Sequence, residues 1–257
     1  MPTPVNNAFY DDLGDRWFEG DDHAIALLRA EGILKLAYVR EVLDREGLGA
    51  VRGGPEHGRI LDAACGAGLI ALPLAEAGFD VLGVDLSAGS IEAARSRVPD
   101  GGSARFETGD ATDLLAVPGV APETFDAVLL LDMLEHVEST PAVLAEAARV
   151  LRPGGVMVFN TFNQTPLAWL VAIHGFKVVV REAPQHLHVY RLFQSPETLT
   201  ERCAEAGLTM REIRGVRPEL NRAFWRSVRR RRVDPGFRFR SSSSDAVGYM
   251  GYAVKRA

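Results

Sequence analysis

The sequence predicts an α/β fold built on a doubly wound, largely parallel sheet with helices on both faces. Short apolar segments alternate with helical patterns between residues 59 and 161, a glycine-rich turn follows the first apolar segment, and residues 125–131 form an unbroken apolar run. Strands that helices cover on both faces have such continuous runs, and their alternation with helices is typical of βαβ units. A chain of 257 residues is long enough to form one large domain with its own core.

The segment before this alternation divides into an arm and a helix. Residues 1–22 have no apolar period, which predicts an arm, whereas Ala24–Leu43 has apolar residues every three to four positions, which predicts a helix. Residues 51–58, with the sequence VRGGPEHG, have the composition of a turn. The aromatic residues of the arm that are available to fold onto the body are Phe9, Tyr10, Trp17 and Phe18.

Five strands and three helices are expected between residues 59 and 161. The expected strands are Arg59–Ala63, Asp80–Val84, Ala104–Glu107, Phe125–Leu131 and Val156–Thr161. The expected helices are Gly66–Ala77, Ser90–Val98 and Thr140–Val150. Gly78 ends the first helix, Ser87 or Ser90 caps the second, and 152-RPGG-155 stops the third.

The pattern changes after Asn163. Residues 165–181 are apolar and helix-like, and a histidine-rich turn, 184-PQHLHVY-190, follows them. The next helix is well delimited, because Ser195 caps it, Pro196 occupies its first turn and Gly207 stops it. The expected final strands, on either side of an irregular Arg- and Ser-rich segment, are Leu208–Val216 and Val247–Val254.

Composition narrows the class of protein. The formal net charge is −5, but residues 211–257 hold thirteen Lys and Arg against four Asp and Glu. Cys65 and Cys203 are too few for a disulfide framework and suit a reducing compartment. Residues 1–25 have no basic stretch leading into an apolar one, and no run of eighteen apolar residues exists. We therefore expect a cytoplasmic protein with neither a secretion signal nor a transmembrane helix.

The chemistry is concentrated in a strand that leads into Gly66-Ala67-Gly68 and then a predicted helix. Such glycines let the backbone approach a ligand, and a helix N-terminus points free N–H groups at it. Because Gly66 and Gly68 also fit the dinucleotide fingerprint, the loop alone leaves an NAD-linked oxidoreductase open. A tight turn in some other α/β protein is the simplest alternative.

Three carboxylates at strand ends favour a different ligand. Asp62, just before the glycines, would repel a pyrophosphate but pair with an ammonium group. Asp85 ends the second strand, where a carboxylate accepts hydrogen bonds from ribose hydroxyls. Asp110 ends the third strand and is placed to meet an adenine amino group. An amino acid, a ribose and an adenine in one molecule predict S-adenosylmethionine.

These segments resemble those of a known family. Residues 60-ILDAACGAG-68 and 81-VLGVDLS-87 resemble the glycine motif and ribose-binding strand end of class I S-adenosylmethionine-dependent methyltransferases. LLDMLEHV (130–137) and VLRPGG (150–155) resemble the segments after their fourth strand and before their fifth. The pair 160-NTFNQTPLAWLVAIHG-175 and 184-PQHLHVY-190 is similar, more specifically, to the O-methyltransferases of ubiquinone biosynthesis. The resemblance covers roughly residues 30–205.

The resemblance implies a Rossmann-like sheet of seven strands in the order 3-2-1-4-5-7-6, with the last strand antiparallel. It implies cofactor contacts at Lys35, where the family usually has Arg, and at Ala64, Asp85 and Leu131. The chain also has Gly-Ala-Gly for the family's Gly-Gly-Gly, and 184-PQHLHV-189 for its Pro-Lys-Gly-Thr-His-Asp. The predicted cofactor-binding residues are Lys35, Asp62, Ala64, Gly66, Gly68, Asp85, Leu86, Asp110, Ala111 and Leu131.

Methyl transfer to a phenol or catechol needs in-line positioning and a base for the hydroxyl proton. The candidate bases are His136 and His188. Asp132, Glu135 and His136 have i, i+3, i+4 spacing, so on one helical turn they would share a face and could hold Mg²⁺ or another divalent cation. The resemblance implies such a cation, but the Glu-His pair also recurs as a pocket wall in methyltransferases without metal.

Two further segments are candidate contact surfaces. Residues 167–180 are apolar but include His174 and Lys177, so they suit either an interfacial helix that accepts a polyprenyl tail or a lid helix packed on the core. Arg229–Arg232 suggests a solvated loop first, an anionic lipid contact second and nucleic acid a distant third. Because no aromatic-interleaved platform accompanies it, we expect no nucleic-acid partner.

The sequence therefore predicts an S-adenosylmethionine-dependent O-methyltransferase acting on a phenol or catechol, with a polyprenylated ubiquinone precursor as the implied acceptor. The alternatives are a methyltransferase of an unrelated natural product, an NAD-linked oxidoreductase and a non-catalytic nucleotide-binding module. We expect residues 1–50 to cover the cofactor site, and residues 51–257 to form the methyltransferase domain with an acceptor and membrane-contact insertion around 163–194. A cytoplasmic protein in peripheral contact with an anionic membrane would fit this division.

Overall fold

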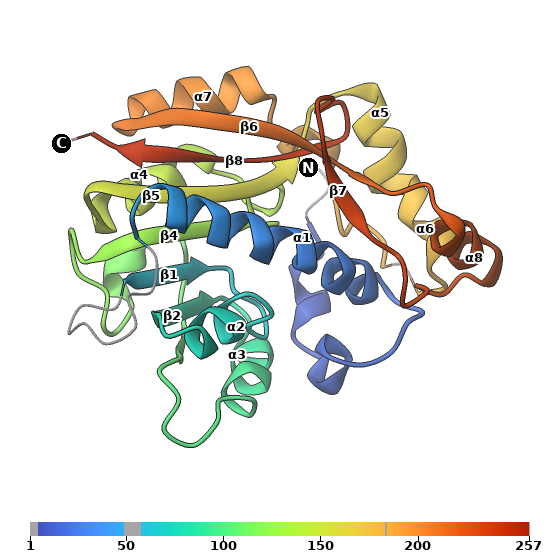
Figure 1. Cartoon of the computed structure of the whole chain (residues 1–257), viewed down its shortest axis with the longest axis horizontal. Helices are drawn as coiled ribbons and strands as arrows, with labels where there is room; N and C mark the ends of the chain where they lie inside the picture. The colour runs from blue at the N-terminus through green and yellow to red at the C-terminus, as the bar shows by residue number, and fades with distance from the viewer. Residues whose placement is uncertain (1–4, 49–57, 183, 257) are drawn as a thin grey trace.

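The computed structural model describes residues 5–48, 58–182 and 184–256, and one mixed β-sheet forms its centre (Figure 1). Within these residues the sheet has eight strands in the order β3-β2-β1-β4-β5-β8-β6-β7. Strands β1 to β5 pair in parallel, whereas β8 is antiparallel to both β5 and β6. The strands are β1 (Arg59–Ala63), β2 (Asp80–Asp85), β3 (Arg105–Thr108), β4 (Phe125–Leu131), β5 (Leu151–Phe162), β6 (Leu208–Pro218), β7 (Phe239–Ser242) and β8 (Gly248–Lys255).

The predicted α/β class is confirmed, but the predicted count of seven strands is wrong. Seven of the strands follow the expected order, with the last strand of the chain antiparallel to its neighbours. The eighth strand, β7, pairs antiparallel with the outer edge of β6. Its sequence, Phe-Arg-Ser-Ser, lies in the segment expected to be irregular and has a single apolar residue, so no strand pattern marks it.

Helices cover both faces of the sheet, as expected for a doubly wound fold. On one face α4 and α7 pack on a core that contains Leu61, and on the other α1, α2 and α3 pack on a core that contains Ile60. These adjacent residues of β1 point to opposite faces, which explains why the strand is apolar throughout. The helices are α1 (Ala24–Arg45), α2 (Ala71–Glu76), α3 (Ala88–Arg95), α4 (Thr140–Val150), α5 (Pro166–Trp169), α6 (Phe176–Val179), α7 (Pro196–Glu205) and α8 (Arg222–Arg230).

Element boundaries differ from the prediction where the backbone takes special conformations. Helix α2 begins at Ala71 rather than at Gly66, because Gly66 and Gly68 have φ of +53° and +78° and the intervening residues form turns. Residues 152–155 bulge within β5, whose pairing shifts from Leu151 to Val156 along β4. Ser87, rather than Ser90, caps α3 by accepting from Ser90 N at 3.1 Å. The predicted turn at 51–57 lies outside the described residues.

The predicted helix at 165–181 is three consecutive pieces. A π-helical segment, η5 (Leu170–Gly175), separates α5 from α6. The expectation of a solvated loop at Arg229–Arg232 is wrong, because Arg229 and Arg230 end α8 and Arg231 caps it in the left-handed conformation. The helix was not predicted because arginines outnumber its apolar residues. Its apolar side chains, which include Ala223 and Phe224, pack against the body of the protein.

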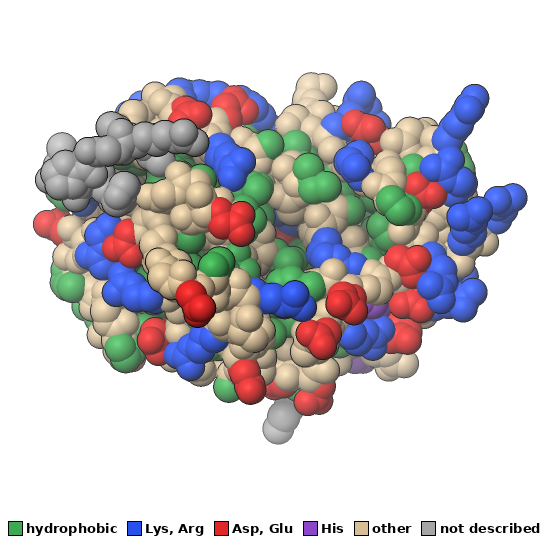
Figure 2. Space-filling model, turned by 60° about the horizontal axis from the view of Figure 1, so that its bottom comes forward, with side chains coloured by type: hydrophobic (Ala, Val, Ile, Leu, Met, Phe, Trp, Pro, Cys, Tyr) green, Lys and Arg blue, Asp and Glu red, His purple; other side chains and the backbone are tan. Residues whose placement is uncertain are grey.

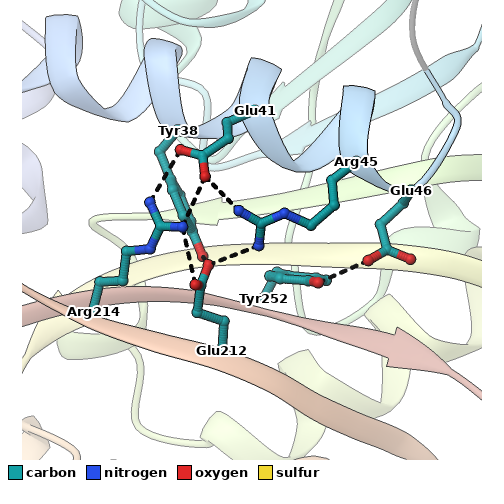
Figure 3. A network of polar contacts seen from close by, with 7 residues as sticks. All are labelled: Tyr38, Glu41, Arg45, Glu46, Glu212, Arg214 and Tyr252. Atoms are coloured by element: carbon teal, nitrogen blue, oxygen red, sulfur yellow. Dashed lines mark hydrogen bonds and ion pairs between the residues drawn. The ribbon is translucent and has the colours of Figure 1, made fainter.

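A polar network fastens the C-terminal half of α1 to the sheet (Figure 3). Tyr38 donates its hydroxyl hydrogen to Glu212 on β6 at 3.1 Å. Arg214, also on β6, donates to both carboxylate oxygens of Glu41 at 2.7 and 3.0 Å. Burial, followed by the neighbouring Glu212 charge, raises the pKa of Tyr38, so its hydroxyl remains a donor. Because Lys35 lies one turn before Tyr38, this network fixes the part of α1 from which Lys35 reaches the strand ends.

Candidate active site

A cavity of about 310 Å³ opens at the carboxyl ends of β1, β2, β3 and β4. Nine of the ten predicted cofactor-binding residues line it: Lys35, Asp62, Ala64, Gly66, Asp85, Leu86, Asp110, Ala111 and Leu131. Gly68 lies behind the cavity, where an added Cβ would come within 2.8 Å of Phe106. Gly68 therefore permits close packing of the loop, and Gly66 is the glycine that faces the ligand space.

Asp85 organises the glycine loop from the end of β2. One carboxylate oxygen accepts from Gly66 N at 2.8 Å and the other accepts from Ser87 N at 2.9 Å. Each oxygen keeps lone pairs for a ligand, and both face a cavity of suitable size for a ribose. Burial raises the pKa of Asp85, and hydrogen bonds from these backbone donors oppose that rise.

Asp62, at the end of β1, is a buried carboxyl group that lines the cavity. Burial, reinforced by the charges of Asp85 and Asp132, raises the pKa of Asp62 to about 8. A carboxyl group in this state gains stability as a carboxylate only if a positive charge enters the cavity. The ammonium of an amino-acid ligand would supply that charge.

Lys35 enters the cavity from α1 between two carboxylates. Its ammonium contacts Asp132 and lies 3.3 Å from Glu31. Burial acts to lower the pKa of Lys35, but Asp132 and Glu31 outweigh it and leave the pKa raised. Because an ammonium has three donors, one remains for a ligand carboxylate.

Asp132 therefore does not lie where the predicted helical turn would put it. Its φ of +55° sets it apart from the single 3₁₀ turn η4 (Leu134–His136), and its carboxylate turns towards Lys35. The end of the cavity beside Asp110 is more open, since Asp110 and Leu86 are both exposed. There Asp110 accepts from Thr112 N and Oγ1, each at 2.8 Å, beside the exposed Leu86 and the buried Ala111.

A second cluster lies beside the cavity and combines a predicted metal ligand pair with a predicted base. Glu135, His136 and His188 each present one ligand atom, and these atoms lie within 4.8 Å of one another. Thr161 donates to Glu135 at 2.7 Å, which orients the carboxylate. The set that the structure brings together is thus Glu135, His136 and His188, rather than the predicted set with Asp132.

The two imidazoles of this cluster have different environments. His188 Nδ1 lies 2.9 Å from the carbonyl oxygen of Ala172, so Nδ1 carries the hydrogen and Nε2 is free to accept a proton or bind a cation. His136 Nδ1 is buried and has no partner among the described residues. Burial lowers the pKa of both histidines, that of His136 to about 3, so both are neutral ligands at neutral pH.

The N-terminal arm supplies walls that the cofactor motifs did not predict. Tyr10 and Trp17 line the cavity and stack, with ring centroids 5.8 Å apart. Tyr10 also meets His136 edge-on at 6.1 Å, so it lies between the cofactor space and the histidine cluster. Trp17 leaves no room for a side chain on Gly66, since an added Cβ would come within 2.6 Å of its ring. The only sequence signal was the aromatic content of the arm.

The comparisons with known proteins agree with this geometry. The methyltransferase domain family matches residues 61–159. Over 87% of this chain and of the relative, the sequence is 34% identical to the ubiquinone biosynthesis O-methyltransferase of Azorhizobium caulinodans. The Methylocella silvestris protein of the same name is 36% identical, over 87% of this chain and 88% of its own. The magnesium protoporphyrin IX methyltransferase of Synechocystis, solved with bound S-adenosylhomocysteine, superposes with a TM-score of 0.63 at 18% identity, covering 97% of this chain and 95% of that one.

Fold, cavity and relatives together define an S-adenosylmethionine-dependent methyltransferase. The oxidoreductase and non-catalytic alternatives are not supported. The chain belongs to the ubiquinone biosynthesis O-methyltransferase family, and it is an O-methyltransferase.

Replacing Asp85 with alanine is expected to weaken S-adenosylmethionine binding by about 2–3 kcal/mol, because charged hydrogen bonds to two ribose hydroxyls are lost. Isothermal titration calorimetry measures this directly. Asp80→Ala is the matched control, since Asp80 lies at the opposite end of the same strand and away from the cavity. Unchanged affinity in Asp85→Ala would place the ribose elsewhere.

The raised pKa of Asp62 has a pH consequence. Below about pH 8 Asp62 is mostly protonated in the free protein, and it must lose that proton to pair with the ligand ammonium. We therefore expect S-adenosylmethionine affinity to rise between pH 6 and pH 7, with proton release on binding. Calorimetry in buffers of different ionisation enthalpy counts the protons, and Asp62→Asn should abolish the release. Equal release in that variant would assign the proton to another group.

Proposed function

We propose that the protein transfers the methyl group of S-adenosylmethionine to a phenol or catechol hydroxyl of a polyprenylated ubiquinone precursor. The observation that carries the acceptor class is the setting of His188. Its ring is surrounded by Phe162, Phe176 and Phe193, with centroids 4.9, 5.9 and 6.4 Å away, and it lies 5.3 Å from His136 at the cavity wall. Aromatic walls suit an aromatic acceptor, and the names of the relatives point to the same pathway.

The mechanism follows from what surrounds the two ends of the reaction. Lys35 and Asp62 hold the carboxylate and ammonium of the cofactor, and Asp85 holds its ribose, so the sulfonium methyl is presented towards Tyr10 and His136. In the form without a cation, His188 Nε2 takes the acceptor hydroxyl proton. The resulting oxygen forms a bond to the methyl carbon as the carbon–sulfur bond breaks, and S-adenosylhomocysteine leaves. The enclosing arm excludes water and contributes rate by positioning.

Radiolabelled methyl transfer to a panel of catechols with and without a prenyl chain tests this function. Preference for prenylated catechols supports it, and mass spectrometry should then show an unmethylated quinone precursor accumulating in a deletion strain. A natural-product phenol as the preferred acceptor would keep the chemistry but overturn the pathway. Binding of S-adenosylmethionine with no methyl transfer to any phenol would overturn the proposal altogether.

We also propose that Glu135, His136 and His188 hold a divalent cation. The site fits one: the ligand atoms converge, His136 Nδ1 has no partner in the described chain, and both imidazoles are neutral. Burial, followed by the Asp132 charge, raises the pKa of Glu135 to about 8, which an adjacent cation would reverse. One carboxylate and two imidazoles favour Zn²⁺, Mn²⁺ or Fe²⁺ over Mg²⁺, which prefers oxygen ligands. When bound, the cation would occupy His188 Nε2 in place of the proton, and its Lewis acidity would lower the acceptor hydroxyl pKa so that the hydroxyl proton passes to bulk solvent.

A peripheral membrane contact through residues 163–194 is the third part of the proposal. None of the described helices is long and apolar enough to cross a membrane. Leu167, Trp169 and Leu170 are nonetheless exposed on α5 and η5, while Ala172 of the same segment binds His188. The insertion thus joins an exposed apolar surface to the acceptor site, as a prenylated acceptor requires.

Vesicles containing anionic lipid are expected to co-sediment the protein, and Leu167→Glu with Leu170→Glu should weaken this co-sedimentation. Val171, the next residue along, is half-buried and is therefore left unchanged. Ile33→Glu on α1 is the matched control, because Ile33 is as exposed as Leu170 and belongs to a different element. Wild-type protein that stays in the supernatant at low salt would make the insertion a lid only.

The division of labour along the chain is proposed to match these roles. Residues 1–50 cover the cofactor, the segment from 51 carries the methyltransferase domain, and 163–194 receives the acceptor. The arm's place in the cavity wall supports the first assignment. We propose a cytoplasmic enzyme that works at the membrane surface.

A further inference from the structure

Helix α8 presents an outward face that the methyltransferase fold does not use. Figure 1 shows α5, α6 and α8 at one end of the molecule, and Figure 2 shows Lys and Arg side chains projecting from that end beside apolar ones. Trp225 on α8 is 60% exposed, the largest exposed fraction among the tryptophans that the structure describes. An exposed aromatic side chain indicates an interaction surface when further apolar and charged side chains accompany it.

The inward face of α8 packs on the protein, and this packing fixes the orientation of the outward face. Asn221 caps α8 by accepting from Phe224 N at 3.0 Å, and Phe224 packs on Phe237. At the C-terminal end, Arg231 donates to the carbonyl oxygens of Lys177 and Val180, so α8 is tied to α6. The outward residues therefore cannot turn inward without breaking these contacts.

The outward face alternates cationic and apolar side chains. Arg222, Trp225 and Arg229 lie at i, i+3 and i+7, so they share one face of the helix. Leu220, just before the helix, is 59% exposed, and Val178 on the adjoining α6 is 53% exposed. A tryptophan flanked by arginines on its helix face, with exposed aliphatic residues on the adjoining segments, matches the boundary between lipid headgroups and acyl chains.

Arg222 and Arg229 differ from Arg226 and Arg232 in whether an acidic side chain binds them. Arg226 is bound by Asp234 at 2.7 Å and Arg232 by Asp21 at 2.6 Å, which accounts for both structurally. Arg222 and Arg229 have no acidic partner among the described residues, although both are exposed. Two cations left unneutralised on either side of an exposed tryptophan complement an anionic surface rather than a neutral one.

We propose that α8 is a lipid-surface anchor that binds anionic phospholipids, with Arg222 and Arg229 on the phosphates and Trp225 at the acyl-chain boundary. The proposal rests on the membrane contact proposed for residues 163–194 and extends it to a second, separate element. A bilayer explains the exposed aliphatic residues Leu220 and Val178 on the segments adjoining α8, which an RNA backbone would not. With both elements engaged, the insertion that holds His188 would face the bilayer that stores a prenylated acceptor.

Tryptophan fluorescence with vesicles of brominated phosphatidylglycerol tests the anchor in the full chain. Trp169→Phe leaves Trp225 as the exposed tryptophan, since Trp17 is 3% exposed. In this variant we expect a blue shift and quenching with anionic vesicles and neither with phosphatidylcholine. Arg222→Glu with Arg229→Glu should lower vesicle affinity about thirtyfold or more, at about 1 kcal/mol per cation removed and a further penalty for each new anion. Arg40→Glu with Arg211→Glu, which makes the same charge change on α1 and β6, should lower it far less.

The outcomes separate this proposal from those on which it rests. If Trp225 is not quenched while Trp169 is quenched in Trp225→Phe, the α5 contact stands and the α8 anchor is overturned. If neither is quenched, both membrane contacts are overturned, and catechol methylation in detergent still reports independently on the O-methyltransferase. If the double Arg variant loses binding to a mixed RNA but the wild type never binds vesicles, the face is a nucleic-acid site and the anchor is overturned.

Discussion

Replacing His188 with alanine is expected to lower kcat about 10²- to 10⁴-fold while S-adenosylmethionine affinity stays nearly unchanged. His188 Nδ1 is occupied by the Ala172 carbonyl, which leaves Nε2 to accept the hydroxyl proton or, in the cation-bound form, to bind the proposed cation. The substitution removes both roles. The choice of His188 rests on its hydrogen bond to the Ala172 carbonyl, because burial lowers the pKa of both imidazoles, that of His136 to about 3. Steady-state kinetics with a catechol, together with calorimetry for the cofactor, separate the two effects.

His174→Ala is the matched control for this prediction. His174 lies on η5 in the same insertion, is exposed, and contacts Trp169 rather than the cavity. Its loss should leave kcat close to that of the wild type. If His188→Ala keeps kcat within about tenfold of the wild type, a range below the usual contribution of a general base, His188 is not the base and positioning alone carries the rate.

The central sheet could be predicted from the sequence because its signals are local. β1, β4 and α4 have the predicted bounds to the residue, since a continuous apolar run and a Ser-Thr-Pro start are each read within one segment. The convergence of the predicted cofactor-binding residues on one cavity followed for a related reason. Parallel strands end at one edge of a sheet, so Asp62, Asp85 and Asp110 had to converge if the strands were right.

The remaining parts depend on contacts between distant segments, which no local pattern encodes. His188 joins Glu135 across fifty-three residues, through an insertion whose π-helical turn places the Ala172 carbonyl under the imidazole. Asp132 was assigned to a helical turn because its spacing allowed it, but its positive φ and the buried Lys35 decide where its carboxylate lies. Helix α8 was not predicted because arginines occupy its solvent-exposed face and leave few apolar residues to show a helical period.

Removal of divalent cations by exhaustive chelation is expected to abolish catechol methylation, and Mn²⁺ or Zn²⁺ should restore it more effectively than Mg²⁺. The reason is the ligand set, one carboxylate and two neutral imidazoles, which suits transition metals. Calorimetry on the cofactor-free protein measures the cation affinity without reference to turnover. Full activity after chelation would remove the cation from the mechanism and leave Glu135 and His136 as a pocket wall.

Two substitutions decide which residues hold that cation. Glu135→Gln removes the ligand charge with little change of shape. It should weaken Mn²⁺ or Zn²⁺ binding at least about 10- to 100-fold, because even changes to residues that only orient the ligands have effects of that size. It should also raise the metal concentration that activity requires. Asp132→Asn tests the set suggested by spacing alone. Because Asp132 pairs with Lys35 and the converging atoms belong to Glu135, His136 and His188, this variant should leave cation affinity nearly unchanged and weaken S-adenosylmethionine binding instead. The opposite result, with cation affinity lost in Asp132→Asn and kept in His188→Ala, would restore the helical-turn arrangement and require Lys35 to release Asp132 when the cation binds.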